Sequence, residues 1–326
     1  MRAFLKIGTA AALLAGCVSL SAQDEVRDNA AEISPPGLSA NTIVVTAQRS
    51  GAPMWTIDTD KGAIILVGEI AAVPKSTPWQ PDRLKEASAE ASRVIIRAQP
   101  KVSPGDVFRL MFKGGSFTKL PSKTVSSDYL SGEELTRLTA LETKYDKDYA
   151  RGSFLMTAFD LLARRLDFDD ETTKDATEIV RKAAKKADVP IARPQRMRGK
   201  DLLDDLAGAE PASHIPCLTA AMTATEIGPD LIERRGNDWR KYDVPAVMAN
   251  PLEIALGQCW PWADSDLGTE IRSSWVAMIE ESVPAEGVTL AVLPLRVLAE
   301  DKGVLDQLEA RGFDIAGPEW KSEEAP

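Results

Sequence analysis

Two apolar runs at opposite ends of the chain constrain its fold most strongly. AIILV spans Ala63–Val67 and VTLAVLPL spans Val288–Leu295. Continuous apolar runs of this length, rich in β-branched residues and bounded by turn signals, predict strands that are buried on both faces of a sheet. Residues 104–283 between them have mostly helical patterns. We therefore predict one α+β domain, with a small central sheet built from N- and C-terminal strands and a mostly helical middle insertion.

The first run belongs to a hairpin that is followed by a crossover. APMWTIDTDKGAIILVGEI, residues 52–70, predicts two strands joined by the turn DTDKG. PWQPDRLKEASAEA, residues 78–91, predicts a helix with Pro81 in its first turn, and SRVIIRA, residues 92–98, predicts a short buried strand. A strand–helix–strand unit of roughly 35 residues suits a parallel crossover.

The rest of the chain contains further helix signals and no internal repeat. Ser131 and Glu134 form a capping-box pattern at the start of a helix in the middle region. The final predicted helix stops at Gly312. We expect a single domain over residues 41–318 and a disordered tail over residues 319–326.

The N-terminus has the features of an export signal. Arg2 and Lys6 precede an apolar run that is too short for a membrane-spanning helix, so residues 1–22 predict a signal peptide. LAGC, ending at Cys17, resembles the bacterial lipobox, in which cleavage precedes a cysteine that becomes lipidated. We expect a lipoprotein of the periplasm or outer membrane of a Gram-negative bacterium. The alternative is plain cleavage after Ala22.

The segment after the signal predicts a linker and then a strand. Residues 23–40 are polar and contain Pro and Gly, which favours a flexible tether. NTIVVTAQR, Asn41–Arg49, resembles the TonB box of TonB-dependent outer-membrane receptors. We expect an ordinary edge strand there, and the alternative is a strand that pairs with a transport protein by β-augmentation.

Cysteine usage agrees with export. If Cys17 is removed or lipidated, Cys217 and Cys259 remain, and we expect them to form a disulfide. Such a bridge would stabilise the fold by about 4 kcal/mol on the chain-entropy model. The alternatives are two buried thiols or a metal pair, for which no CxxC spacing exists.

The charge balance argues against nucleic acid as a partner. The formal net charge is −10, whereas phosphate binding requires clustered cations. The most basic stretch runs from Arg181 to Lys200. Because Lys174, Glu178 and Lys182 alternate in sign at i,i+4 spacing, we expect a solvated helix face followed by a linker.

The order of these segments resembles that of a known family. Trp55, the strand that ends at Gly68, the helix starting near Trp79, and Arg272 in the closing helix all match its pattern. NDWRKYDV is similar to the family's Trp–x–x–Gly–Asp segment, with Tyr242 in place of the glycine. Over roughly residues 52 to 315 the chain resembles the TraB/GumN family, the bacterial relatives of the Tiki proteases.

The resemblance implies a metal site that this chain does not reproduce. In the family, G-x-x-H ends the first strand, an acidic residue ends the second, and another G-x-x-H lies on the closing strand. Two imidazoles and a carboxylate could hold a divalent ion that acidifies water. Here those positions carry Ala71, Arg97 with Gln99 after it, and Ala291 with Pro294. We therefore expect a degenerate site, with no metal, no cofactor and no catalytic residue.

Other chemistries have weak support. His214 is the only histidine, and we expect it to have a surface or capping role. KGGS at Lys113 lacks phosphate-loop spacing, while a carboxylate pair for glycoside hydrolysis stays open among 49 acidic residues. We expect Glu69 to be a surface carboxylate paired with Arg97; the alternative is that Arg97 offers a fixed cation to an anionic ligand.

These expectations favour a non-catalytic binding or assembly factor at the cell envelope. Its partner would be an envelope protein or an anionic ligand, and it would contact the membrane only through a lipid anchor. The alternative is a residual metal-independent hydrolase of peptides or glycosides that uses Glu69 or another carboxylate.

Overall fold

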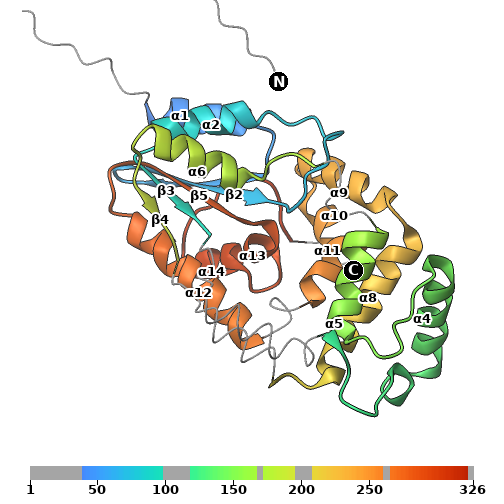
Figure 1. Cartoon of the computed structure of the whole chain (residues 1–326). Coiled ribbons are helices and arrows are strands. Elements are labelled where there is room, and N and C mark those ends of the chain that lie inside the picture. The colour runs from blue at the N-terminus through green and yellow to red at the C-terminus, as the bar shows by residue number, and fades with distance from the viewer. Residues whose placement is uncertain (1–38, 98–117, 167–171, 195–207, 260–264, 322–326) are drawn as a thin grey trace, which may run out of the picture. The chain divides into compact units, whose positions relative to one another are not determined.

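A mixed sheet forms the centre of the fold (Figure 1). The computed structural model describes residues 39–97, 118–166, 172–194, 208–259 and 265–321. Within them the sheet has five strands in the order β1-β2-β5-β3-β4, and β1 is antiparallel to β2 whereas the other neighbours are parallel. The strands are β1 Met54–Thr59, β2 Gly62–Glu69, β3 Arg93–Ile96, β4 Ile191–Ala192 and β5 Gly287–Pro294.

The C-terminal strand β5 lies between two N-terminal strands. Ala291 is paired with Leu66 of β2 on one side and with Ile95 of β3 on the other. The predicted α+β class, with a sheet made from both ends of the chain, is confirmed. The predicted crossover from β2 to β3 is parallel and skips one position, which β5 fills. The short strand β4 lies in the middle region and was not indicated by the sequence pattern.

Two glycines allow β2 and β5 to start side by side. A Cβ atom built on Gly62 would lie 1.8 Å from the carbonyl oxygen of Gly287. Gly287 itself has φ +78°, a conformation that side chains with a Cβ rarely adopt. Any larger residue at Gly62 would therefore push these two strands apart.

Helices cover both faces of the sheet (Figure 1). Helices α1, α2 and α6 pack on one face, and α12, α13 and α14 lie on the other. Their bounds are α1 Ala40–Gln48, α2 Pro81–Glu90, α6 Ala176–Lys186, α12 Ser265–Ser282, α13 Leu295–Ala299 and α14 Val304–Ala310. As predicted, α2 begins at Pro81 and buries Leu84 and Ala87.

The other described helices of the middle region pack mainly around a second hydrophobic cluster. The α-helices are α4 Gly132–Tyr145, α5 Phe154–Asp160, α8 Ile215–Ile227, α9 Asp230–Arg240, α10 Val244–Ala249 and α11 Pro251–Gln258. Short 3₁₀ or π-helical turns are η1 Ser126–Asp128, η2 Leu161–Arg165 and η3 Pro211–His214. The capping box predicted from Ser131 and Glu134 is present at the start of α4.

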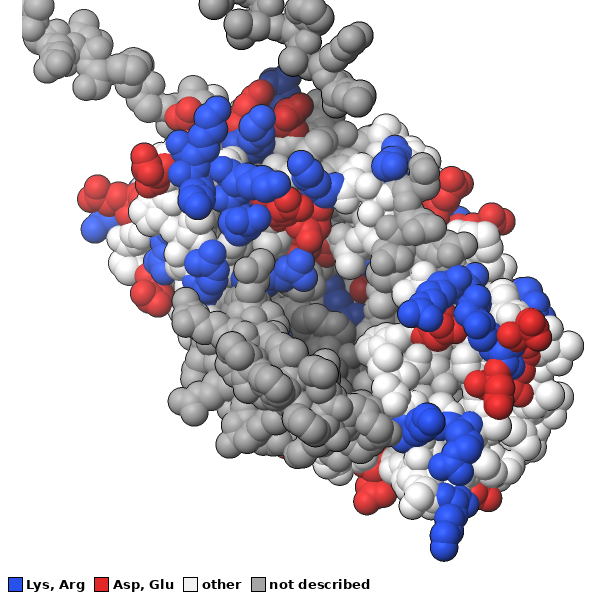
Figure 2. Space-filling view, viewed as in Figure 1, with Lys and Arg blue, Asp and Glu red and all other residues white. Residues whose placement is uncertain are grey.

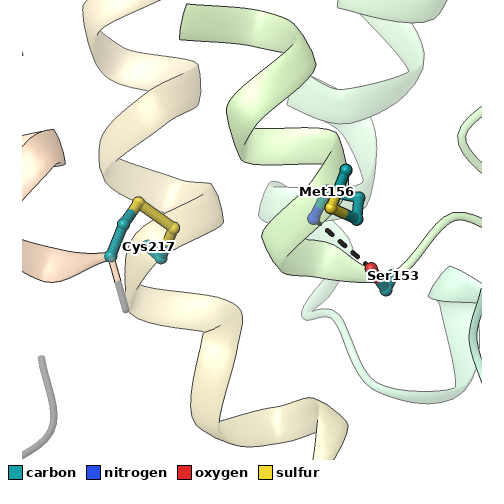
Figure 3. Close-up of a disulfide and its surroundings, with 4 residues drawn as sticks. Ser153, Met156 and Cys217 are labelled. Carbon is teal, nitrogen blue, oxygen red and sulfur yellow. Dashed lines mark hydrogen bonds between the residues drawn. A yellow bond between two sulfur atoms is a disulfide. The ribbon is translucent and has the colours of Figure 1, made fainter. Parts of the chain in front are cut away.

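A disulfide between Cys217 and Cys259 joins the start of α8 to the end of α11, as predicted (Figure 3). Both cysteines are buried in the second cluster. Beside them, Ser153 caps α5 by accepting a hydrogen bond from the Met156 backbone at 3.3 Å. The bridge therefore closes a loop across the helical middle, where it constrains the unfolded chain.

The segment Asn41–Arg49, expected to be an edge strand, forms most of helix α1. Ser39 caps this helix and Ala40 is its first residue. These last two residues of the expected tether over residues 23–40 are therefore part of the folded domain. Ile43 and Ala47 are four residues apart and both buried, whereas Val45 is 45% exposed. Burial of one helical face has overridden the β propensity of this short segment.

The C-terminal residues 319–321, expected to be disordered, have defined contacts. The Trp320 indole Nε1 donates a 2.9 Å hydrogen bond to Asp306, and Lys321 forms a 2.5 Å ion pair with Glu309. The Trp320 side chain also packs against the hydrophobic core. The contacts with Asp306 and Glu309 hold residues 320 and 321 against α14.

Several predictions fall outside the described residues. They are the signal peptide over residues 1–22 with Cys17, most of the tether over residues 23–40, Gln99, and the KGGS segment at Lys113. In the part of the chain that is described, no helix combines the length and apolar character required to cross a membrane.

Candidate functional site

Three parallel strands end together at one edge of the sheet. Glu69 at the end of β2 is paired with Pro294 at the end of β5. Arg97 directly follows β3, whose last residue, Ile96, is paired with Val292 of β5. The structure thus places Glu69, Pro294 and Arg97 on neighbouring strand ends. Carboxyl ends of parallel strands are a common place for ligand sites.

Glu69 is buried beneath the first turn of α6. Its side chain is 5% exposed. Oε2 accepts a 2.9 Å hydrogen bond from the Thr177 backbone, and Oε1 accepts a 2.7 Å hydrogen bond from the Thr177 hydroxyl. Burial raises the pKa of Glu69 above its usual value, and the Arg97 charge and the Thr177 hydrogen bonds oppose this shift only in part.

Arg97 is held by two carboxylates. Its Nη2 donates a 2.9 Å hydrogen bond to Asp175, and its Nε lies 3.7 Å from Glu69 Oε1. The expected pairing of Glu69 with Arg97 is therefore present, but the expectation that Glu69 is a surface carboxylate is wrong. The helix predicted in this region begins at Ala176, so its first turn covers the end of β2 and contributes Asp175 and Thr177. Asp175 at a helix N-cap was the signal that could have located them.

Ala71 lies just past the strand end and is exposed. Its carbonyl oxygen accepts a 2.8 Å hydrogen bond from Arg235 of α9. Arg235 is buried and forms a 2.6 Å ion pair with the buried Glu253 of α11. Burial alone would raise the pKa of Glu253. The charges of Arg235 and Arg296 have a larger opposite effect, so its pKa lies below the usual value. Neither Arg235 nor Glu253 was identified from the sequence.

The same group of charges extends to Arg272. Arg296 of α13 lies 3.3 Å from Glu253 Oε1 and 3.9 Å from Glu300. Glu300 in turn forms a 2.7 Å ion pair with Arg272. We call Arg235, Glu253, Arg296, Glu300 and Arg272 the arginine–glutamate chain. It connects Arg272, which matches the family pattern, with the loop that carries Ala71.

Gly68 and the segment NDWRKYDV also meet. The buried Trp239 donates a 2.8 Å hydrogen bond from Nε1 to the carbonyl oxygen of Gly68. A Cβ atom at Gly68 would lie 2.6 Å from Leu295 Cδ1, so a larger residue there would force the Leu295 side chain to move. Tyr242, in place of the family's glycine, has φ +65°. Tyr242 thus adopts the left-handed backbone conformation that glycine adopts most easily.

The only histidine is not at the strand ends. His214 ends η3 at the N-cap position of α8, and it is half-buried. Among the described residues, no group of three or more His, Cys, Asp or Glu side chains is arranged to hold a metal ion.

A basic groove lies between α2 and α6. It has a volume of about 470 Å³, and its charged lining residues are Asp82, Lys85, Lys174, Lys182 and Lys186. Figure 2 shows Lys and Arg side chains gathered over these two helices. Lys182 forms the expected i,i+4 ion pair with Glu178 at 2.5 Å. The sequence predicted a solvated helix face here. It did not show that lysines of α2 and α6 come together in one groove.

Comparison with known proteins identifies the family. The sequence model of the TraB/PrgY/gumN family matches residues 53–316. No curated protein and no solved structure matches the chain. The match begins next to β1 and ends at Ala316, whose backbone pairs with Thr56 of β1, so it includes every strand of the sheet described above. The chain belongs to the TraB/PrgY/gumN family.

Proposed function

We propose that this protein is an exported family member with a degenerate metal site, and that it acts as a non-catalytic binding or assembly factor at the cell envelope. Its anchor would be a lipid on Cys17, and neither metal nor cofactor would be required. The proposal rests on the side chains at the strand ends.

The observation that supports it most is that three of the family's ligand positions carry side chains that cannot bind a metal. Ala71 and Pro294 have no side-chain ligand atom, and Arg97 carries a permanent positive charge. Glu69 is the remaining acid of this set, and both of its oxygens already accept hydrogen bonds from Thr177. A divalent ion at this place would lie close to the guanidinium, which repels it. These residues do not fit the metal that the resemblance implies.

The basic groove between α2 and α6 supports a binding role. Arg97 is neutralised by Asp175 and Glu69, so it offers little charge to an anionic ligand. The groove has four lysines and one aspartate in its lining. If the partner is anionic, this groove is the better place for it.

Export is supported by the N-terminal pattern and by the disulfide. Cys217 and Cys259 are bonded, which is typical of oxidising compartments. Mass spectrometry of the membrane fraction should find acyl chains on Cys17, and a Cys17→Ser variant should lose membrane association. Unmodified protein that begins at Gln23 would show plain cleavage instead.

Metal analysis of the purified full chain tests the degenerate site. We expect far less than one equivalent of zinc and no peptidase activity that a chelator abolishes. A variant with Ala71→His, Arg97→Glu and Pro294→His restores the donors and should gain zinc if the strand-end assignment is correct. Stoichiometric zinc in the wild type, with activity lost to a chelator, contradicts the proposal.

The alternative is a metal-independent hydrolase that uses Glu69. The raised pKa of this carboxyl is a property that general acids share. Its burial and its two hydrogen bonds to Thr177 leave little room for a substrate. Peptide or glycoside hydrolysis that survives a chelator and disappears in a Glu69→Gln variant would favour the hydrolase.

A further inference from the structure

A second hollow of about 620 Å³ lies beyond the outer strand of the sheet. Its volume is typical of small-ligand sites. Its walls come from the end of α1, the start of β1, the connection from α9 to α10, and the C-terminal segment. The lining residues are Gln48, Ala52, Met54, Tyr242, Asp243, Pro245, Gly317, Pro318 and Glu319. None of them is one of the strand-end residues Glu69, Ala71, Arg97 and Pro294, and none belongs to the arginine–glutamate chain.

The C-terminal wall of this cavity is fixed in place. Thr56 and Ala316 exchange backbone hydrogen bonds of 2.8 and 3.0 Å. Trp55 donates a 2.8 Å hydrogen bond from Nε1 to the carbonyl oxygen of Pro318. A Cβ atom on Gly317 would lie 2.4 Å from the Trp55 ring, so the segment passes very close to β1. The cavity is thus formed before any ligand arrives, which lowers the entropic cost of binding.

Tyr242 presents its ring at the cavity from a strained backbone. Its φ of +65° is rare for a bulky residue, and its side chain is 41% exposed. Tyr242 directly follows the C-cap residue of α9, Lys241, a position where left-handed backbone usually carries glycine. Strained positions that the fold retains are concentrated at functional sites. The Tyr242 hydroxyl donates a 3.5 Å hydrogen bond to the carbonyl oxygen of Gln48, so the ring joins two walls of the cavity.

The charges of the lining select the kind of ligand. Asp243 and Glu319 are acidic, and no Lys or Arg is among the lining residues. Asp243 uses Oδ1 to cap α10 through the Ala246 backbone at 3.1 Å. Carboxylates only accept hydrogen bonds, so they favour a ligand that donates several. An aromatic ring and two carboxylates in the lining of one cavity favour a cation.

We propose that this cavity binds an organic cation, an alkylammonium or alkylguanidinium group with an apolar stem. The cation lies over the Tyr242 ring beside Asp243 and Glu319, and the stem contacts Met54 and Pro318. The same chemistry is offered by a free amine and by a Lys or Arg side chain of a peptide. This inference goes beyond the proposed function and does not depend on the metal site.

Calorimetry with two matched probes tests the charge requirement. Butylguanidinium and butylurea have nearly the same shape, and the first is a cation while the second is neutral. The full chain should bind butylguanidinium at least roughly tenfold more tightly than butylurea. Equal binding of the two probes, stronger binding of a neutral sugar such as glucose, or no binding of butylguanidinium overturns the proposal.

Variants separate the ligand role of Tyr242 from its strain. Tyr242→Gly removes the ring and should weaken butylguanidinium binding roughly tenfold, while glycine accepts φ +65° without strain. The matched control is Lys302→Gly, at φ +56° and outside the cavity, which should raise the melting temperature and leave binding unchanged. Unchanged binding in Tyr242→Gly overturns the proposal.

A further comparison identifies the source of the cation. A blocked tripeptide with a central Arg that binds more tightly than butylguanidinium supports a peptide ligand, and equal or weaker binding supports a free organic cation. In either case Glu319→Gln should weaken binding severalfold. Loss of binding in these variants would leave the zinc result for the strand ends unaffected, so the two proposals can fail separately.

Discussion

Glu69 is a buried carboxyl on which two opposing effects act. The Arg97 charge and the hydrogen bonds from Thr177 favour its ionised form. Burial favours its neutral form and is the larger effect, so the pKa is raised. Ionisation of this side chain therefore costs stability, and the Arg97 charge and the Thr177 hydrogen bonds reduce that cost only in part.

This balance predicts a specific pH dependence. The folded protein holds the Glu69 proton above the usual pKa of 4.5, where the unfolded chain has released it. The free energy of unfolding therefore falls as pH rises from that value through the folded pKa. Glu69→Gln removes this contribution, so the variant should gain stability relative to the wild type as pH rises.

Urea denaturation of both proteins at several pH values measures the difference. Carboxyls such as Glu253, whose pKa is lowered, make the free energy of unfolding rise with pH in both proteins. Their contribution cancels when the free energy of the variant is subtracted from that of the wild type. A wild type that becomes more stable than the Glu69→Gln variant with rising pH would contradict the assignment.

At the scale of elements, α1 shows where local sequence is a poor guide. IVV within Asn41–Arg49 has high β propensity, yet the segment is helical. A helix places Ile43 and Ala47 on one face, whereas a strand would place Ile43, Val45 and Ala47 on one face. In the structure Val45 is exposed and the other two are buried. This arrangement removes the strand proposed for β-augmentation.

Two substitutions distinguish the helix from the strand. Ile43→Glu places a charge in the core and should lower the free energy of unfolding by roughly 3 kcal/mol. Val45→Glu should change it by less than about 0.5 kcal/mol, because the side chain already faces solvent. Chemical denaturation measures both. Similar losses in the two variants would indicate a strand.

The elements that were predicted correctly have strong local signals. The hairpin, α2 and β5 come from continuous apolar runs or a helical apolar face, and the capping box at Ser131 comes from two residues three apart. The position of β5 between β2 and β3 was not predictable in this way. A sheet with β3 directly beside β2 and β5 on the outside would bury the same apolar side chains.

The candidate site was predictable only in part for the same reason. The strand ends could be located, since each follows an apolar run. The pairing of Arg235 with Glu253 depends on helices that meet in the fold, and an isolated Arg or Glu on a helix is usually at the surface. Burial of this pair leaves no periodic pattern in the sequence.

Across the whole molecule, the arginine–glutamate chain joins segments that are distant in sequence. Arg235 and Glu253 come from the helical middle, and Arg296, Glu300 and Arg272 come from the C-terminal part. Through Ala71 the chain also holds the loop after β2. Removing one partner of a buried ion pair leaves an uncompensated charge.

Glu253→Gln should therefore lower the free energy of unfolding by roughly 3 to 5 kcal/mol. The control is Glu86→Gln, which breaks the exposed ion pair with Arg83 and should have little effect. Guanidinium titrations of the two variants give the comparison. Equal stability of the two would show that Arg235 and Arg296 are compensated by other groups.

The place of β5 also has a consequence for how the polypeptide is made. Synthesis proceeds from the N-terminus, so β2 and β3 emerge long before the strand that joins them. Until Gly287–Pro294 has left the ribosome, the centre of the sheet is open and its neighbours have unpaired edges. The sheet of a nascent chain therefore stays incomplete almost to the end of translation. A premature stop codon before residue 287 would give a truncated protein without β5, which proteases should degrade.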